Sequence, residues 1–238
     1  MFRLCIVVLV LFCHGFSYSD EVFVSGRSLY LSFANEKQDI EVNWPVICGM
    51  KDAKRQEELN RCLFNLFLGS ESTTSASGTI KIPSFDPNEN IPNWFSDVIR
   101  FDTHFNRDDL LCLEKVSYVY RGGSAHGMTT WTYWLFDLRT GKSLELEDLL
   151  VPGFEARLTQ LINAHVPTDS EYRIETPIPF EKSSEWFLTE QYFVIHFPLY
   201  AIAPYAAGPI NVKIPLSEMK DLMREDGAGK ILHQSFMN

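Results

Sequence analysis

The sequence predicts an α+β fold with a mainly antiparallel sheet and about three packed helices. Runs rich in Val, Thr and aromatic residues recur along the chain with turn residues between them, which is typical of strands joined by hairpins. Apolar residues recur at helical spacing in only three segments, and these lie between groups of strands. The 238 residues suffice for one large domain or for two lobes.

The first half of the chain combines short β-rich runs with one clear helix. The runs lie between residues 22 and 48 and are broken by a polar segment at 35–38. Asp52 is the expected N-cap of the helix and Gly69 its end. Its apolar stripe consists of Leu59, Cys62, Leu63, Leu66 and Phe67. Such a stripe usually packs into the core.

A meander of three strands follows a Ser- and Thr-rich loop at residues 70–78. We expect strands at 95–105, 110–121 and 128–138, because β-branched and aromatic residues dominate there. Polar residues 106–109 and the glycine-rich residues 122–127 make the turns between them.

The second half predicts two further helices and three strands. A helix is expected from Pro152 to His165, because proline suits a first helical turn and histidine a last one. A hairpin at 186–197 and a strand at 210–214 come next. Ser217 is the expected cap of a terminal helix that carries Met219, Leu222 and Met223.

The charge balance excludes one broad functional class. The chain has 21 basic and 31 acidic residues, for a net charge of −10. Nucleic-acid binding through a general positive field needs clustered Lys and Arg, and we do not expect it. With 45% hydrophobic and 22% charged residues, the chain has the composition of a folded protein.

Residues 1–19 have the pattern of a secretory signal peptide. Arg3 precedes the apolar run 4–12, and Ser17 and Ser19 supply small residues before a cleavage site at Asp20. The apolar run is far shorter than the ~20 residues needed to span a bilayer. We therefore expect a periplasmic or secreted protein, whose mature charge is 20 basic against 31 acidic residues, or −11.

The cysteines that follow the signal peptide have two interpretations in an exported protein. Cys48, Cys62 and Cys112 stay in the mature chain, and in an oxidising compartment two of them can pair. A Cys48–Cys62 disulfide would contribute roughly 3 kcal/mol by closing a short loop. The other interpretation is three buried thiols. No CxxC spacing occurs, so we expect neither zinc binding nor redox chemistry from them.

The turn sequence GGSAHG at residues 122–127 is the first candidate for chemistry. His126 can serve as a general base or ligand, and Ser124 lies two residues before it. A simpler interpretation is a tight bend, since Gly122 and Gly123 adopt backbone conformations closed to other residues. The turn joins strand to strand and has no following helix or Lys, so it is not a phosphate loop.

The other polar candidates favour structural roles. The six histidines show no HExxH, HxH or HxxxH spacing, and we expect no metal and no cofactor. His104 and His196 lie in predicted strands and His165 at a helix end. The acidic groups 108–109 and 145–148 occupy a turn and a helix approach, where carboxylates are common without function.

Aromatic density is the remaining signal. Trp131 and Tyr133 face opposite to Trp134 and Phe136 on the predicted strand at 128–138. Two further tyrosines, at 200 and 205, flank an apolar segment. One aromatic set would belong to the core, and the other would form a platform for sugar rings or a protein partner.

An ordered set of motifs resembles a known bacterial domain. The motifs are YRGGSAHG at residues 120–127, FDLRTGK at 136–142, LEDLL at 146–150 and PLYAIAPYAAG at 198–208. They resemble the extracytoplasmic domain of unknown function in the ectodomain of the lysozyme-sensing anti-sigma factor RsiV and in PdaC-type peptidoglycan deacetylases. The resemblance covers about residues 116–222, and we divide the mature chain into an N-terminal lobe at 20–115 and this C-terminal α+β domain at 116–238.

The resemblance implies a fold outside the cytoplasm and binding of lysozyme or cell wall. It does not imply catalysis, because the deacetylase chemistry resembles that of a separate domain. We therefore expect an exported, non-catalytic binding protein of the cell envelope that engages a cationic protein such as lysozyme, or peptidoglycan. The residues expected to bind are Tyr120, Gly122, Gly123, His126, Trp131, Tyr200 and Tyr205.

Two other functions stay open at this point. One is a peptidoglycan-modifying hydrolase or deacetylase that uses His126 as its acid or base. The other is a purely structural envelope protein. An extra Ser124 makes the glycine turn longer than the GGAHG form common in the resembling domain.

Overall fold

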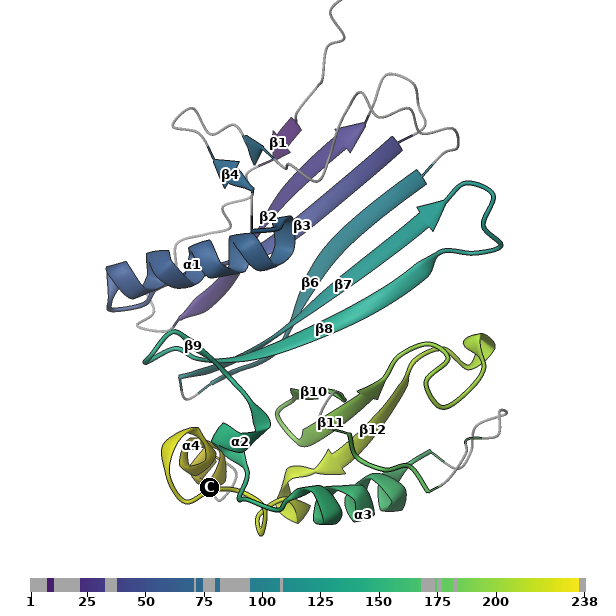
Figure 1. Ribbon diagram of the computed structural model, residues 1–238. Helices are drawn as coiled ribbons and strands as arrows, with labels where there is room; N and C mark the ends of the chain where they lie inside the picture. The colour runs from purple at the N-terminus through teal and green to yellow at the C-terminus, as the bar shows by residue number, and fades with distance from the viewer. Residues whose placement is uncertain are drawn as a thin grey trace, which may run out of the picture. The chain divides into compact units, whose positions relative to one another are not determined.

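The predicted α+β class is confirmed by the computed structural model (Figure 1), which has helices α1 to α4 and strands in three sheets. The structure describes residues 8–10, 22–32, 38–70, 72–74, 80–81, 95–107, 109–167, 174, 177–181 and 184–235. In this part of the chain no helix is long and apolar enough to cross a membrane.

The largest sheet has seven strands in the order β1-β2-β3-β6-β7-β8-β9. Their bounds are Val8–Val10, Phe23–Ser32, Gln38–Cys48, Phe95–Arg107, Leu110–Arg121, Met128–Asp137 and Lys142–Leu144. β3 pairs in parallel with β6, whereas β1 with β2, β2 with β3, and β8 with β9 pair antiparallel. A two-stranded sheet of β4 (Thr73–Thr74) and β5 (Ile80–Lys81) is separate.

The parallel pair explains where α1 (Ala53–Leu68) sits in the chain, because parallel neighbours need a long crossover connection. The predicted caps are confirmed. The Asp52 carboxylate accepts a hydrogen bond from the Arg55 backbone N–H at 3.0 Å, and Gly69 ends the helix with φ of +93°. The buried face of the helix consists of Leu59, Leu63, Phe67 and Leu68.

One side chain fixes α1 against β3. The Asn60 amide donates to the Ile47 carbonyl at 2.8 Å, and its oxygen accepts from the Ile47 N–H at 2.7 Å. Asn60 therefore supplies the donor and the acceptor that a neighbouring strand would supply to this position of β3.

The expected Cys48–Cys62 disulfide is absent, which corrects the prediction. Cys48, Cys62 and Cys112 are all thiols, and only Cys112 is buried. Asn60 points at β3, and two residues along a helix turn the side-chain direction by about 200°. Cys62 therefore lies on the solvent side of α1, away from the end of β3.

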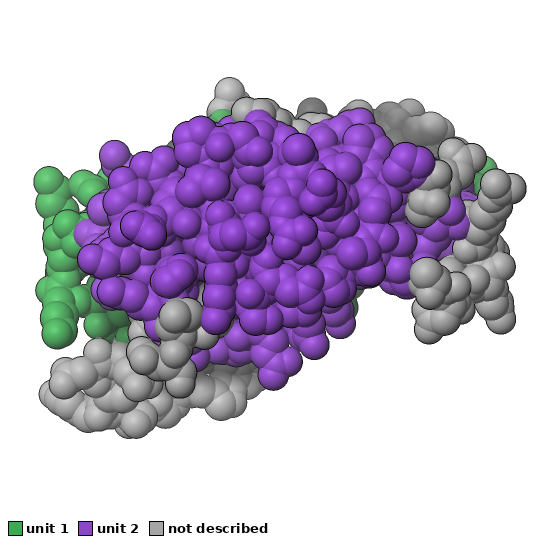
Figure 2. All heavy atoms as spheres, turned by 90° about the horizontal axis from the view of Figure 1, so that it is seen from below, with its two compact units in different colours: residues 1–101, 115–130 green, residues 102–114, 131–238 purple. Residues whose placement is uncertain are grey.

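The chain forms two compact units, coloured separately in Figure 2. Unit 1 comprises residues 1–101 and 115–130, and unit 2 comprises 102–114 and 131–238. The chain passes from unit 2 to unit 1 between residues 114 and 115, one residue from the expected domain boundary between 115 and 116. The chain also passes from one unit to the other after residues 101 and 130, because β6, β7 and β8 each supply residues to both units.

Unit 2 adds a three-stranded antiparallel sheet in the order β10-β11-β12 and the remaining helices. The strand bounds are Glu185–Leu188, Tyr192–Phe197 and Ile210–Pro215. The helices are α2 (Leu146–Leu149), α3 (Glu155–His165) and α4 (Gly227–Ser235), with short 3-10 turns at Tyr205–Ala207 and Leu216–Glu218. Leu158, Leu161 and Ile162 of α3 belong to the core of this unit.

The terminal helix expected after Ser217 is wrong. A single 3-10 turn covers Leu216–Glu218, and Met223 then pairs with Leu150 as an isolated bridge. The helix starts ten residues later, at Gly227. Gly229 is required there, because a Cβ at this position would lie 2.6 Å from the Leu149 carbonyl oxygen.

Lys115 stabilises the end of α1 within unit 1. Its ammonium group donates to the carbonyls of Leu66 and Phe67 at 2.8 and 3.4 Å and lies 5.6 Å from the Phe67 ring centre. Burial lowers the pKa of Lys115 and raises the pKa of Asp97, and the attraction between the two charges opposes both shifts. The cation therefore neutralises unsatisfied helix-end carbonyls, where positive charge is favoured.

We expect Lys115→Met to lower the free energy of unfolding by about 1–2 kcal/mol, because charged hydrogen bonds to the helix end are lost. Urea denaturation measures this change. Lys213→Met, at an exposed position of β12, is the matched control and should change stability little. Equal stability of the two variants would contradict the role of Lys115.

We also expect Cys62 to react with a thiol reagent in the native protein and Cys112 to react only after unfolding. Burial raises the pKa of the Cys112 thiol to about 12, so that almost no thiolate is present at neutral pH. Mass spectrometry after alkylation identifies the modified residues. If neither Cys48 nor Cys62 is alkylated in denaturant until a reductant is added, the two residues form the disulfide that the structure lacks.

Candidate functional site

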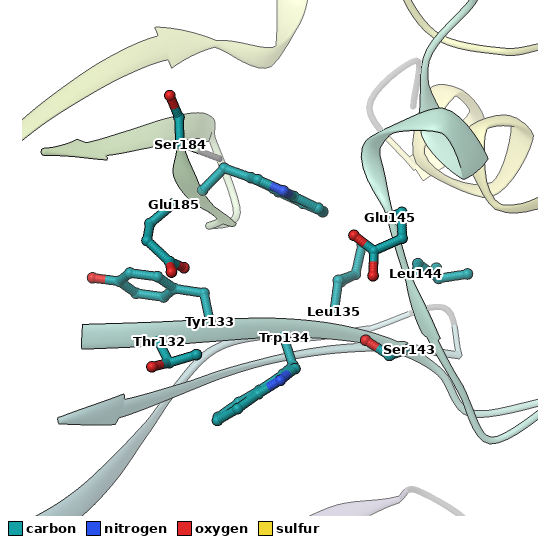
Figure 3. A pocket seen from close by; sticks show the side chains of 10 residues that line it. Thr132, Tyr133, Trp134, Leu135, Ser143, Leu144, Glu145, Ser184 and Glu185 are labelled. Carbon is teal, nitrogen blue, oxygen red and sulfur yellow. The ribbon is translucent and has the colours of Figure 1, made fainter. Parts of the chain in front are cut away.

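A pocket of about 240 Å³ lies within unit 2, beside the edge of β8 (Figure 3). β8, β9 and β10 contribute to it, together with the start of α2. The lining residues are Thr132, Tyr133, Trp134, Leu135, Ser143, Leu144, Glu145, Ser184, Glu185 and Trp186. Figure 3 shows Tyr133 and Leu135 on the pocket side of β8, whereas Thr132 and Trp134 point to the other side of the strand.

The charge of this pocket is entirely acidic. Glu145 and Glu185 are the charged groups among the lining residues, which include no Lys, Arg or His. Glu185 is half-buried, and burial raises its pKa, which a hydrogen bond from the Tyr133 backbone partly offsets. Figure 3 shows Glu185 beside Tyr133, with Glu145 across the pocket. The Tyr133 and Trp186 side chains complete a lining suited to an organic cation.

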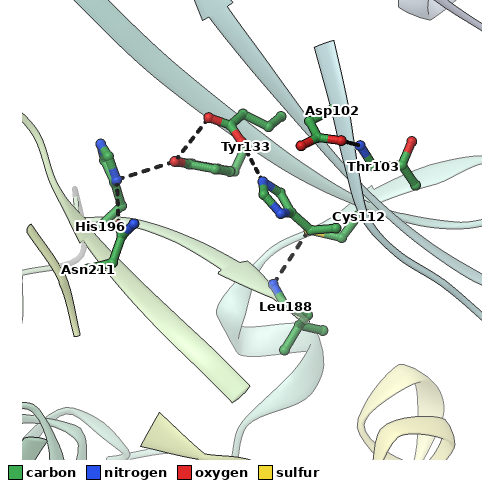
Figure 4. A network of polar contacts seen from close by, with 9 residues as sticks. Asp102, Thr103, Cys112, Tyr133, Leu188, His196 and Asn211 are labelled. Carbon is green, nitrogen blue, oxygen red and sulfur yellow. Dashed lines mark hydrogen bonds and ion pairs between the residues drawn. The ribbon is translucent and has the colours of Figure 1, made fainter. Parts of the chain in front are cut away.

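A polar network within unit 2 includes Tyr133 of the pocket lining (Figure 4). The Tyr133 hydroxyl lies 3.5 Å from Glu114 Oε1 and 3.2 Å from His196 Nδ1. Glu114 Oε2 also pairs with His104 Nε2, and His196 Nδ1 lies 2.8 Å from Asn211 Oδ1. The network thus joins residues of β6, β7, β8, β11 and β12.

Strand register brings these distant residues together. His196 lies directly opposite Glu185 on β10 and opposite Asn211 on β12. Trp131 and Tyr133 are two residues apart on β8 and share a face, and their rings lie 5.0 and 5.3 Å from the His196 ring. Phe187 stacks on Tyr133 at 4.6 Å.

The hydrogen-bond partners fix the direction of two bonds in this network. An amide oxygen accepts, so His196 Nδ1 carries the proton and donates to Asn211, and Tyr133 donates its hydroxyl proton to Glu114. Burial and then the charge of Glu114 raise the pKa of Tyr133, which stays a phenol. His196 is 2% exposed, and its Nε2 is the one buried side-chain polar atom without a partner in the part of the chain that is described.

The glycine turn has a structural explanation. The Ser124 N–H donates to the Arg121 carbonyl at 3.0 Å, and Gly123 has φ of +93°, as the third position of a type II turn requires. The Tyr120 hydroxyl donates to the Ser124 carbonyl at 3.3 Å. Gly127 leaves no room for a side chain, because a Cβ would lie 2.3 Å from the Tyr118 ring.

His126 is exposed in this turn, and its Nδ1 lies 2.9 Å from the carbonyl of the next residue, Gly127. The turn residues Tyr120, Gly122, Gly123 and His126 belong to unit 1, whereas Trp131 belongs to unit 2. The residues expected from sequence are therefore distributed over both units.

The two remaining predicted residues form a separate aromatic pair in unit 2. Tyr200 and Tyr205 have ring centres 5.5 Å apart, and Tyr200 is 57% exposed. Tyr200 also has φ of +67°, which is unusual for a residue other than glycine. Trp131 is instead half-buried, and its ring packs against the His196 ring of the polar network.

Comparison with known proteins agrees with the fold. Residues 147–217 match the family described as "Protein of unknown function (DUF3298)". A search of curated proteins finds no match.

Two solved DUF3298 structures are similar over most of their length. A DUF3298 family member from Bacteroides fragilis has 17% identity and a TM-score of 0.67, with 91% of this chain and 98% of that chain covered. A DUF3298 family protein from Pseudomonas aeruginosa has 19% identity and a TM-score of 0.54, with 93% of each chain covered. At these identities the likeness shows the shared fold.

The DUF3298 match contains only part of the site. Glu185, His196 and Asn211 lie inside residues 147–217, whereas Glu114 and Tyr133 precede the match. Sequence reasoning assigned His104 and His196 structural roles and missed Glu114 and Glu185. The predicted hairpin around residues 106–109 was the one signal that could have placed His104 near Glu114.

We expect the free energy of unfolding to decrease as the pH falls below about 6.5, because of His196. Burial lowers the pKa of His196 from 6.5, although the Asn211 hydrogen bond and Glu114 oppose this shift. The unfolded chain then binds more protons than the folded one, so acid destabilises the fold by up to about 1.4 kcal/mol per pH unit. The contribution of His196 to stability is complete above pH 6.5 and is lost as the pH falls toward the pKa of His196 in the folded protein.

Urea denaturation from pH 5 to 8 measures this slope. His196→Gln should reduce the slope, whereas the control His126→Gln, at an exposed position, should leave it unchanged. An unchanged slope in a folded His196→Gln protein would contradict the assignment.

Proposed function

We propose that this chain is an exported, non-catalytic binding protein of the cell envelope that engages a cationic protein such as lysozyme. The acidic pocket of unit 2 receives a Lys or Arg side chain of that partner. The single observation that carries this proposal is that Glu145 and Glu185 line the same pocket and that its lining residues include no basic group.

The distribution of charge supports the proposal. Unit 2 has 19 acidic and 10 basic residues, a net charge of −9, whereas unit 1 has 12 acidic and 11 basic residues, a net charge of −1. Nearly all of the negative charge therefore belongs to the unit that contains the pocket. Such a field raises the association rate of a basic partner.

The size of the pocket limits its occupant. Pockets for drug-sized ligands have volumes of about 300–1,000 Å³. The 240 Å³ pocket is smaller and suits one long side chain. Lys and Arg place an aliphatic stem against apolar surface and a cationic head near carboxylates, which matches tryptophan and glutamate on the same lining.

The resemblance to the RsiV and PdaC domains supports an extracytoplasmic role, and the signal pattern at residues 1–19 agrees with export. Catalysis receives less support. His126, the expected acid or base of the alternative hydrolase, is exposed in a turn, where its Nδ1 lies 2.9 Å from the Gly127 carbonyl.

We expect lysozyme to bind the purified protein in calorimetry at low salt, with weaker binding at high salt. The Glu145→Gln/Glu185→Gln protein should bind about 10- to 100-fold more weakly, because loss of the charged contact with the bound side chain costs about 1.5–3 kcal/mol in total. The matched control is Glu57→Gln/Glu58→Gln on the exposed face of α1, which removes the same charge from unit 1.

Each outcome of this experiment decides between alternatives. Equal weakening by both double variants would mean that net charge acts without the pocket. No binding of lysozyme at low salt would overturn the proposal for this partner, and sedimentation with purified peptidoglycan would then test the wall itself.

A further inference from the structure

Three groups that commonly ligate metals meet on the hairpin of β6 and β7. One nitrogen of His104 and one oxygen each of Asp102 and Glu114 all lie within 4.8 Å of one another. We propose that Asp102, His104 and Glu114 bind a divalent transition-metal ion, with Zn²⁺ as the preferred occupant. This site shares no ligand with the acidic pocket and does not depend on the proposed function.

Strand geometry preforms the set. Asp102 and His104 are two residues apart on β6 and therefore leave the strand on the same face. Glu114 lies on β7, the neighbouring strand in the sheet. Three ligands on two adjacent strands are held by the backbone ladder, so little chain entropy is lost when a metal binds.

Each carboxylate has one oxygen held by an outer donor. The Thr103 N–H donates to Asp102 Oδ1 at 2.8 Å, and the Tyr133 hydroxyl donates to Glu114 Oε1 (Figure 4). Asp102 Oδ2 and Glu114 Oε2 are then the oxygens left to coordinate, and Glu114 Oε2 already pairs with His104 Nε2. Metal sites typically orient their ligating carboxylates by such outer hydrogen bonds.

The histidine ring is also held in place. Phe187 lies 4.4 Å from the His104 ring centre at 30°, and Tyr133 lies 6.0 Å away. Ligands of a tetrahedral Zn²⁺ at about 2.0–2.2 Å are roughly 3.4 Å apart, and the three ligand atoms lie within 4.8 Å of one another, so the Asp102 oxygen must move by about 1.4 Å at most. Rotamer adjustment of exposed Asp102 can supply this movement, because buried Glu114 already contacts His104.

The donor set favours Zn²⁺ over Mg²⁺ or Ca²⁺. Imidazole suits Zn²⁺, whereas Mg²⁺ and Ca²⁺ prefer all-oxygen sites with more ligands. Three protein ligands with one exposed carboxylate also leave a fourth position for water.

The test is calorimetric titration of the purified protein with Zn²⁺ alone, with Mg²⁺ as competitor. We expect one equivalent of Zn²⁺ to bind in an excess of Mg²⁺. Asp102→Asn and His104→Gln should each lower the affinity at least 10-fold, and Tyr133→Phe, which removes a positioning hydrogen bond, about 10-fold. The controls His126→Gln and His165→Gln lie outside the cluster and should bind as the unmodified protein does.

A second measurement covers variants that fold poorly. Co²⁺ in place of Zn²⁺ gives visible absorption bands whose intensity reports four-coordinate geometry with a histidine ligand, and His104→Gln should abolish them while circular dichroism stays unchanged. The proposal is overturned if Zn²⁺ does not bind at 100 µM or if Asp102→Asn and His104→Gln bind it as tightly as the controls. The cluster would then be a His–Glu ion pair only.

Discussion

Two successive residues of β7 hold the polar interactions on which the described parts of both units depend. Lys115 contacts the last carbonyls of α1 in unit 1, and Glu114 accepts from Tyr133 and pairs with His104 in unit 2. Side chains alternate along a strand, so these two charges leave β7 on opposite faces. A shift of β7 by one residue would place either the Glu114 carboxylate at the carbonyls of α1 or, in the other direction, the Lys115 ammonium among the histidines.

This alternation also explains why partly buried charges are tolerated here. A buried charge is costly unless hydrogen bonds and an opposite charge or dipole compensate for it. Lys115 finds helix-end carbonyls and Asp97, and Glu114 finds two donors from different strands. Each compensation exists only when the strand register is correct, so these groups contribute to a unique fold as well as to its stability.

Local rules predicted much of the fold, and tertiary packing decided the rest. Asp52 and Gly69 delimit α1 as expected, because caps act through neighbouring backbone groups. The helix after Ser217 failed for the opposite reason. Gly227 and Gly229 make α4 a poor helix by propensity, and its place depends on a close approach to the Leu149 carbonyl that no local pattern reveals. For the candidate site, Glu145 and Glu185 are forty residues apart, and only the tertiary packing of β10 near β8 and β9 brings them to one pocket.

The proposed recognition of a basic partner depends on two electrostatic effects with different ranges. The net charge of −9 on unit 2 acts at a distance, but salt screens it beyond about 8 Å under physiological conditions, so it mainly affects association. The pocket acts at contact, where Glu185 is half-buried and screening is weak. Burial raises the pKa of Glu185 because a lone carboxylate is costly there, and an incoming ammonium or guanidinium group would remove that cost. The pocket therefore favours an occupant that carries positive charge into it, which the long-range field alone would not require.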